Sequence, residues 1–345
     1  MSIKKKFSHL GLSISFYIVF SNLLSGVISF LVTFVTAFMA TYESSQAALS
    51  AGQSIDMDTV QNALMNIQSN STLTTMLSMI VSYFVAVPIT MLVLNSPKHQ
   101  DVPLKGLSFS TPYESAQKKN LSYKELFNFI LFMFPLGIFG SIIGSGLAAL
   151  INLATGSNMD DYLSAMLSDM PLGTVLLLSV ILAPVFEELL YRYAVIGYCR
   201  RYGEWNAIIV SAFIFGIIHT NLFQFFYTFM LGILLGYVYV YTRKLIYTII
   251  MHVTFNFFGA FVPILITTSL AESTMFTIGY SLLQYLVAVI GLILLIRFLK
   301  NERLLKTSEG APIQERFSKE ALLNPGMIVL YIICLILTVF LMAFA

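Results

Sequence analysis

Charged residues are scarce in this sequence, and their scarcity decides the class of protein. The chain of 345 residues has 19 Lys and Arg and 17 Asp and Glu, while 57% of its residues are hydrophobic. Its mean hydropathy is +0.83. A soluble domain has about a quarter of its residues charged. The composition therefore excludes a water-soluble globular protein and indicates a chain that lies mostly in a membrane.

Cysteine is also rare. Cys199 and Cys334 lie in different hydrophobic segments, with no CxxC pair and no Cys/His ligand spacing. This pattern excludes a disulfide framework and a structural zinc site, so we expect both residues to be packing residues. The net charge is only +2, and the basic residues are dispersed among short loops. A nucleic-acid partner is therefore not expected.

Long apolar runs are abundant, and a helix needs about 20 residues to cross the hydrocarbon core. They predict an all-α fold, a polytopic transmembrane helix bundle of about eight or nine spans. The run 206–242 is too long for one pass and is divided at the polar "HTN" 219–221. The first run follows three lysines without a small-residue cleavage site, so we expect a retained span. The predicted spans are 10–41, 72–95, 125–154, 173–199, 206–220, 222–242, 245–268, 276–298 and 326–345.

The basic residues alternate between loops, as the positive-inside rule requires. They lie near residues 4–6, 98–124, 200–201, 243–244 and 297–319. The loops between these contain acidic residues but no lysine or arginine. This alternation predicts nine spans with a cytoplasmic N-terminus. Few cysteines and short loops favour a multi-pass protein of a bacterial plasma membrane.

Local patterns agree with these spans. "SYKE" at 122–125 is a capping box, which predicts that a helix begins there. Two GxxxG pairs, Gly140 with Gly144 and Gly232 with Gly236, predict close contacts between helices.

Three charged residues interrupt the apolar segment 181–198: Glu187, Glu188 and Arg192. An ionised side chain at the centre of a membrane helix costs about 2.5–3.5 kcal/mol, so such residues usually mark a functional site. The next helices carry His219, His252 and Asn256. At about 1.5 Å per helical residue, these polar side chains lie at similar depths. We therefore predict that they form one intramembrane site.

Helical periodicity separates the two carboxylates. Glu188 and Arg192 are four residues apart and can form a structural ion pair. Glu187 points roughly 100° away from Glu188, which leaves it free for chemistry. His252 and Asn256 are again four residues apart, so they share one face of a helix.

Pro184 precedes these charges by one turn. It has no N–H for the carbonyl of Val180, so the sequence predicts a local distortion with a freed carbonyl just before Glu187.

Three motifs carry a resemblance to a known family. "EELLYR" at 187–192, "FGIIH" at 215–219 and "HVTFN" at 252–256 are similar to the EExxxR, FxxxH and HxxxN motifs of the CPBP family. That family contains type II CAAX prenyl proteases, bacteriocin-processing enzymes and bacteriocin-immunity proteins. All three motifs occur in order, each on its own predicted helix.

The resemblance implies a glutamate-dependent intramembrane endopeptidase without a cofactor. Glu187 would act with His219 to activate a water, and His252 with Asn256 would stabilise the tetrahedral oxyanion. Arg192 would hold Glu188. The partners would be the lipid bilayer and a peptide or protein substrate at the membrane, prenylated or carrying a bacteriocin-type leader.

The resemblance also divides the chain into three parts. They are N-terminal transmembrane spans with a cytoplasmic loop (1–124), a CPBP-like catalytic transmembrane core (125–262) and C-terminal transmembrane spans (263–345).

Three other functions remain open at this point. Glu187, His219 and His252 could ligate zinc in a metalloprotease, although the sequence has no HExxH. A non-enzymatic immunity or membrane adaptor protein could keep the same residues for helix association. A proton-coupled carrier could use them as a relay, although no internal repeat supports a transporter.

Overall fold

The structure is a computed structural model of the chain, and it describes residues 2–52, 57–58, 61–62, 65, 71–96, 107–109, 118–157, 159–269, 274–301 and 317–344. These residues form helices joined by short connections, and no strand occurs among them. The predicted all-α fold is confirmed. The α-helices are α1 (Ile3–Ala51), α3 (Ser71–Val81), α4 (Val87–Leu94), α5 (Tyr123–Thr155), α6 (Tyr162–Ser168), α7 (Leu172–Val175), α8 (Ala183–Glu187), α9 (Gly197–Cys199), α10 (Glu204–Ile217), α11 (Leu222–Thr242), α12 (Leu245–Asn256), α13 (Val262–Ser269), α14 (Thr274–Lys300) and α15 (Pro325–Phe344).

Several short π-helices and 3₁₀-helices interrupt these α-helices. The π-helices are η1 (Ser82–Ala86), η4 (Leu176–Leu182), η5 (Glu188–Ile196) and η7 (Phe257–Phe261). The 3₁₀-helices are η6 (Arg200–Tyr202) and η8 (Lys319–Ala321). π-Helical turns often occur at functional sites. Of these four, η4 precedes the charged segment and η5 contains Glu188 and Arg192.

The described helices agree with the predicted membrane spans. Seven helical segments are long and apolar enough to cross a membrane. Two shorter apolar helices, Glu204–Ile217 and Pro325–Leu341, coincide with the two remaining predicted spans. The chain is therefore a multi-pass helical membrane protein. The seven segments are Ile3–Ala51, Thr72–Leu94, Tyr123–Thr155, Leu172–Cys199, Leu222–Thr242, Leu245–Thr268 and Thr274–Lys300.

The chain forms two compact units. The smaller unit comprises residues 16–89, in which the hydroxyls of Tyr17 and Ser21 on α1 hydrogen-bond with the hydroxyl of Ser82. The larger unit comprises residues 1–15 and 90–345 and contains all six residues of the predicted site.

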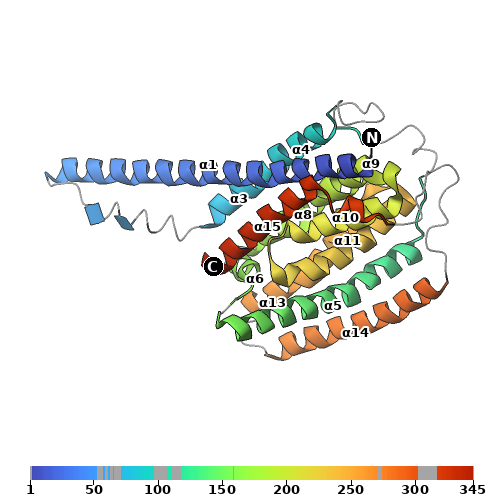
Figure 1. Cartoon of the computed structure of the whole chain (residues 1–345). Coiled ribbons are helices and arrows are strands. Elements are labelled where there is room, and N and C mark those ends of the chain that lie inside the picture. Colours follow the sequence, from blue (N-terminus) through green and yellow to red (C-terminus); the bar gives the residue numbers. More distant parts are fainter. Residues whose placement is uncertain are drawn as a thin grey trace. The chain divides into compact units, whose positions relative to one another are not determined.

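Within the larger unit, α5 packs against both α11 and α14, and α11 packs against α10 (Figure 1). Lipid tails are as apolar as leucine, so tight packing, more than the hydrophobic effect, holds such helices together. The core between α5, α11 and α12 includes Phe129, Phe132, Met133, Leu231, Leu234, Leu235, Tyr237, Val238 and Met251.

The predicted glycine contacts are present. A Cβ atom added to Gly140 would lie 2.3 Å from Cα of Tyr227, so α5 and α11 meet with their backbones close together. A Cβ atom added to Gly232 would lie 2.9 Å from Cα of Ala212, which gives the same kind of contact between α11 and α10. Only glycine fits at these crossings.

Two further predictions from the sequence are confirmed. The hydroxyl of Ser122 accepts a hydrogen bond from the Glu125 N–H, and the Glu125 carboxylate accepts one from the Ser122 N–H, which completes the capping box. Cys199 and Cys334 are both free and buried, as expected of packing residues.

Candidate active site

Glu188 contacts Arg192 and His252 in the buried interior of the larger unit. Its Oε2 lies 3.2 Å from Nε of Arg192, one turn further along η5, and both side chains are fully buried. Its Oε1 lies 3.0 Å from Nδ1 of His252 on α12. The spacing of the sequence indicated the contact with Arg192 but not the contact with His252. The same carboxylate therefore joins η5 to α12.

Glu187 lies on the other side of the His252 ring. Its Oε2 is 3.7 Å from His252 Nε2, and 23% of its side chain is exposed, whereas the Glu188 side chain is fully buried. The imidazole thus stands between two carboxylates that differ in access. A water molecule can reach Glu187, while Glu188 is closed off by its partners.

His219 follows directly after α10. Its Nδ1 lies 2.6 Å from the carbonyl oxygen of Phe215. A carbonyl oxygen only accepts, so Nδ1 carries the hydrogen, and Nε2 of the neutral ring is left with a lone pair. His219 also lines a cavity of about 190 Å³ together with Asp160, Asn221 and Gln224. Its free nitrogen is therefore suited to hold or deprotonate a water.

Asn256 ends α12, and its Nδ2 donates a hydrogen bond of 2.9 Å to the carbonyl oxygen of Ser179. Ser179 belongs to the π-helix η4, in which each carbonyl bonds to the N–H five residues further on. For Ser179 that residue is Pro184, which has no N–H.

The predicted distortion before Glu187 is therefore present, and Ser179 supplies a carbonyl that accepts a side-chain hydrogen bond. The expectation of a freed carbonyl at Val180 stays a prediction. An α-helical spacing of four residues was assumed, whereas the turn is π-helical with a spacing of five. With the spacing of five, the proline leaves the carbonyl of Ser179 free, and the side chain of Asn256 satisfies it.

Phe215 is a residue of this site for which the motif spacing predicted no role. The guanidinium carbon of Arg192 lies 4.6 Å from the centre of its ring. The rings of His219 and His252 meet it edge-on, at centroid distances of 5.0 and 5.7 Å. Phe215 therefore fixes the positions of one cation and two imidazoles.

Ser211 was missed in the same way. Its hydroxyl donates to the carbonyl of Tyr191 at 2.8 Å and lies 3.4 Å from Nη1 of Arg192. The spacing of the sequence could have predicted this position. Ser211, Phe215 and His219 follow one another at intervals of four residues, which places them on one face of a helix.

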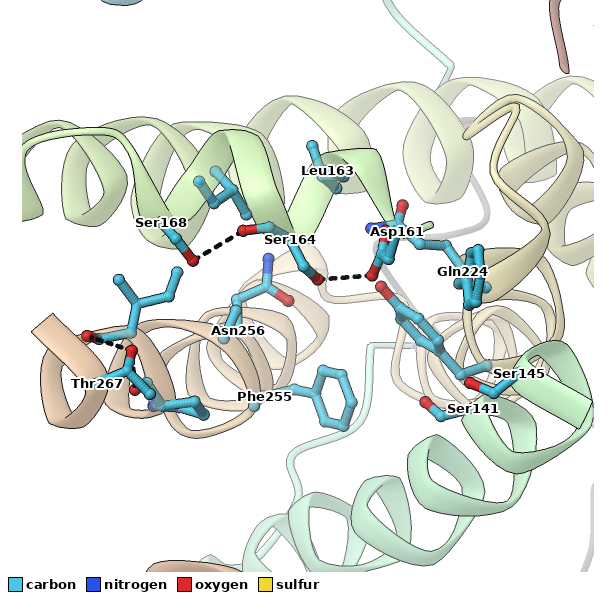
Figure 2. A pocket seen from close by; sticks show the side chains of 17 residues that line it. Ser141, Ser145, Asp161, Leu163, Ser164, Ser168, Gln224, Phe255, Asn256 and Thr267 are labelled. Atoms are coloured by element: carbon cyan, nitrogen blue, oxygen red, sulfur yellow. Dashed lines mark hydrogen bonds between the residues drawn. The ribbon is translucent and has the colours of Figure 1, made fainter. Parts of the chain in front are cut away.

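A larger cavity of about 610 Å³ extends from Asn256 between α5, α6, α11 and the end of α12 with α13. Figure 2 shows Thr267 toward one end of it, Gln224 toward the other and Asn256 between them. The larger and the smaller cavity share Leu163, Phe223 and Gln224 as lining residues. Of the predicted site residues, Asn256 therefore opens onto the larger cavity and His219 onto the smaller one.

The described side chains do not fit a zinc ion as they are placed. Among the residues that the structure describes, no group of three His, Cys, Asp or Glu lies close enough to share a metal ion. The set Glu187, His219 and His252 is thus not arranged as a three-ligand site.

A comparison with protein families supports the resemblance seen in the motifs. Residues 170–258 match the family described as type II CAAX prenyl endopeptidase Rce1-like. This segment contains all three motifs and, in the structure, the elements from α7 to η7. Neither a comparison with curated proteins nor one with solved structures gave a match.

Proposed function

We propose that this chain, whose residues 170–258 match the Rce1-like type II CAAX prenyl endopeptidases, hydrolyses a peptide bond within the membrane. The observation that carries the proposal is the pair of adjacent carboxylates around His252. Glu187 is accessible, and Glu188 is buried with Arg192. The proposed catalytic core is residues 125–262, between the N-terminal spans 1–124 and the C-terminal spans 263–345.

Glu187 and His219 would activate the attacking water. The lone pair on Nε2 of His219 can accept a hydrogen bond from that water, and Glu187 can take its proton. The water oxygen then adds to the scissile carbonyl carbon to give a tetrahedral intermediate. Glu187 passes the proton to the leaving nitrogen as the carbon–nitrogen bond breaks. The step consumes one water and needs no cofactor.

Asn256 and His252 would stabilise the oxyanion of this intermediate. The amide nitrogen of Asn256 has two hydrogens, and only one is used by Ser179. His252 donates through Nδ1 to Glu188, so its Nε2 carries a hydrogen only when the ring is doubly protonated.

Glu188 and Arg192 would act as a structural pair that holds His252. A buried carboxylate with both a guanidinium and an imidazole as partners has little freedom to move. Arg192 is held in turn by the Phe215 ring and the Ser211 hydroxyl. The site would therefore be rigid before substrate binds, as electrostatic catalysis requires.

The proposed setting is a bacterial plasma membrane with the N-terminus in the cytoplasm. The positive-inside pattern of the loops supports this orientation. The proposed substrate is a membrane-associated peptide or protein, such as one with a prenylated C-terminus or a bacteriocin-type leader.

The experiment is a comparison of new protein N-termini, by mass spectrometry, in cells that express either the natural chain or Glu187→Gln. At least one N-terminus should appear only with the natural chain. If the biological activity of the protein survives Glu187→Gln and no N-terminus differs, the chain is a non-enzymatic adaptor or immunity protein. Flux of a solute across sealed vesicles without cleavage would identify a carrier.

A further inference from the structure

Gln224 is a polar residue of the cavity wall that none of the three motifs contains. It lies in the first turn of α11, after the cap residue Asn221, and only 7% of its surface is exposed. Its backbone N–H donates to the carbonyl of Asn221, and its backbone carbonyl accepts from the hydroxyl of Thr228. Its carboxamide has no hydrogen bond to any residue that the structure describes, and it borders both cavities. A buried amide in this state is a ready partner for a ligand.

Most other polar groups of the larger cavity are already engaged. Asp161 accepts hydrogen bonds from Ser164 at 2.6 Å and from Asn221 at 2.9 Å. Ser168 and Thr267 donate to backbone carbonyls of their own helices. Gln224 therefore differs from Asn256, the other carboxamide among the described residues of this wall, because its own carboxamide is left for the cavity.

The charge of the cavity restricts what can enter it. Asp161 is the one acidic side chain among the described residues that line it, and these residues include no lysine, arginine or histidine. The rest of the lining combines hydroxyls and amides with apolar side chains, among them Leu163, Phe255 and Ile264. A carboxylate would lie here near Asp161 without a cation, which is unfavourable. A neutral segment meets no such penalty.

We propose that Gln224 binds the backbone of an uncharged, extended peptide segment of the substrate in this cavity. A carboxamide offers one acceptor and two donors, so it can form paired hydrogen bonds with a peptide group whatever the side chains are. A cavity of about 610 Å³ is of the size that holds drug-sized ligands. Asn256 on the same wall would place that segment next to the reacting carbonyl.

This inference rests on the proposed function and narrows its substrate. The segment beside the scissile bond would be internal to the chain, because a free C-terminal carboxylate is disfavoured in the cavity. Gln224 would thus determine affinity and would take no part in bond breaking.

The test measures binding in the full-length Glu187→Gln variant in detergent, which removes turnover. The probes are two fluorescent forms of one acetylated hexapeptide of alternating alanine and leucine, with a C-terminal amide or with a free carboxylate. The amide should bind at least about tenfold more tightly than the free acid. Adding Gln224→Met, which keeps the length of the side chain but not its hydrogen bonds, should weaken amide binding by about tenfold or more.

Thr267→Val is the matched control, because it lies on the same cavity and its hydroxyl already serves its own helix. It should change the dissociation constant by less than about twofold. Gln224→Glu is a second probe that keeps the shape and loses both donors, and it should also weaken binding. Size-exclusion chromatography of each variant checks folding.

Three results would overturn the inference: no binding of either probe, tighter binding of the free acid, or equal effects of Gln224→Met and Thr267→Val. A different outcome is that an acyl chain displaces the probe and binds the Gln224→Met variant as tightly as the parent. That result would assign the cavity to lipid and would also overturn the inference. Failure of the proposed function is a separate result, namely that cells with the natural chain and cells with Glu187→Gln show the same N-termini, and it does not depend on which probe binds more tightly.

Discussion

Asn256 donates a hydrogen bond to the carbonyl oxygen of Ser179, at 2.9 Å, and so joins the end of α12 to the π-turn before Pro184. The contact fixes the Asn256 side chain in one orientation. Its second N–H hydrogen is then left for a ligand. The hydrogen bond between Asn256 and Ser179 explains how a residue at a helix end can be held for oxyanion binding before substrate arrives.

Asn256→Ala removes the proposed oxyanion donor. Turnover should fall by about 10²–10³-fold with little change in apparent substrate affinity, as for other single oxyanion donors. The Ser179 carbonyl also loses its partner, so the free energy of unfolding should fall by about 1–3 kcal/mol. Steady-state kinetics on folded protein, together with thermal unfolding, separates the two effects.

Asn256→Asp is the harsher form of the same test. It is nearly isosteric, but its carboxylate would face both the Ser179 carbonyl and the oxyanion, so activity should fall at least as far. Normal turnover in the folded fraction of either variant would show that Asn256 serves helix association alone.

Pro184→Ala tests how the π-turn positions Asn256. The alanine supplies an N–H that can bond to the Ser179 carbonyl and compete with Asn256. We expect turnover to fall several-fold while the melting temperature stays level or rises. Pro135→Ala is the control, since Pro135 lies inside α5. Unchanged kinetics in Pro184→Ala would separate the π-turn from catalysis.

Glu188→Gln should mainly lower the free energy of unfolding. The change leaves Arg192 fully buried without its carboxylate, and breaking such a pair costs about 3–5 kcal/mol. The apparent melting temperature should drop clearly, and turnover should also drop because His252 loses the group that orients it.

Arg192→Lys should not behave like the natural chain, because an ammonium cannot reproduce the flat contact with Phe215. A Glu188→Gln variant of normal stability would contradict the structural role of the pair.

Metal removal tests the zinc alternative directly. Activity in detergent should survive exhaustive chelation, and elemental analysis should find less than one zinc per chain. Zinc is the correct assignment if metal and activity disappear together and both return when zinc is added.

Much of this architecture could be predicted from the sequence, for identifiable reasons. A membrane of fixed thickness sets the length of apolar runs, so composition and loop charges placed the spans. The spacing of four between Glu188 and Arg192 gave their proximity. Fixed spacing could also place His252 near Asn256, since both lie on one helix.

The contacts between helices could not be predicted in this way. The bond of His252 to Glu188 depends on how two helices are rotated, and π-turns change that rotation without a clear sequence signal. For the same reason the hydrogen bond between Asn256 and the Ser179 carbonyl could not be predicted. The carboxamide of Gln224 gave no signal either, because its importance lies in a cavity between helices.

The single-turnover rate of Glu187→Gln shows whether Glu187 activates the attacking water. The substrate is a peptide that spans a cleavage site found in cells, and folding is checked by the melting temperature. We expect the single-turnover rate of Glu187→Gln to be lower than that of the natural chain by about 10²–10⁴-fold. The melting temperature should be nearly unchanged, since Glu187 is partly exposed and lies 3.7 Å from its imidazole neighbour. Cleavage at the natural rate by folded Glu187→Gln would contradict the account.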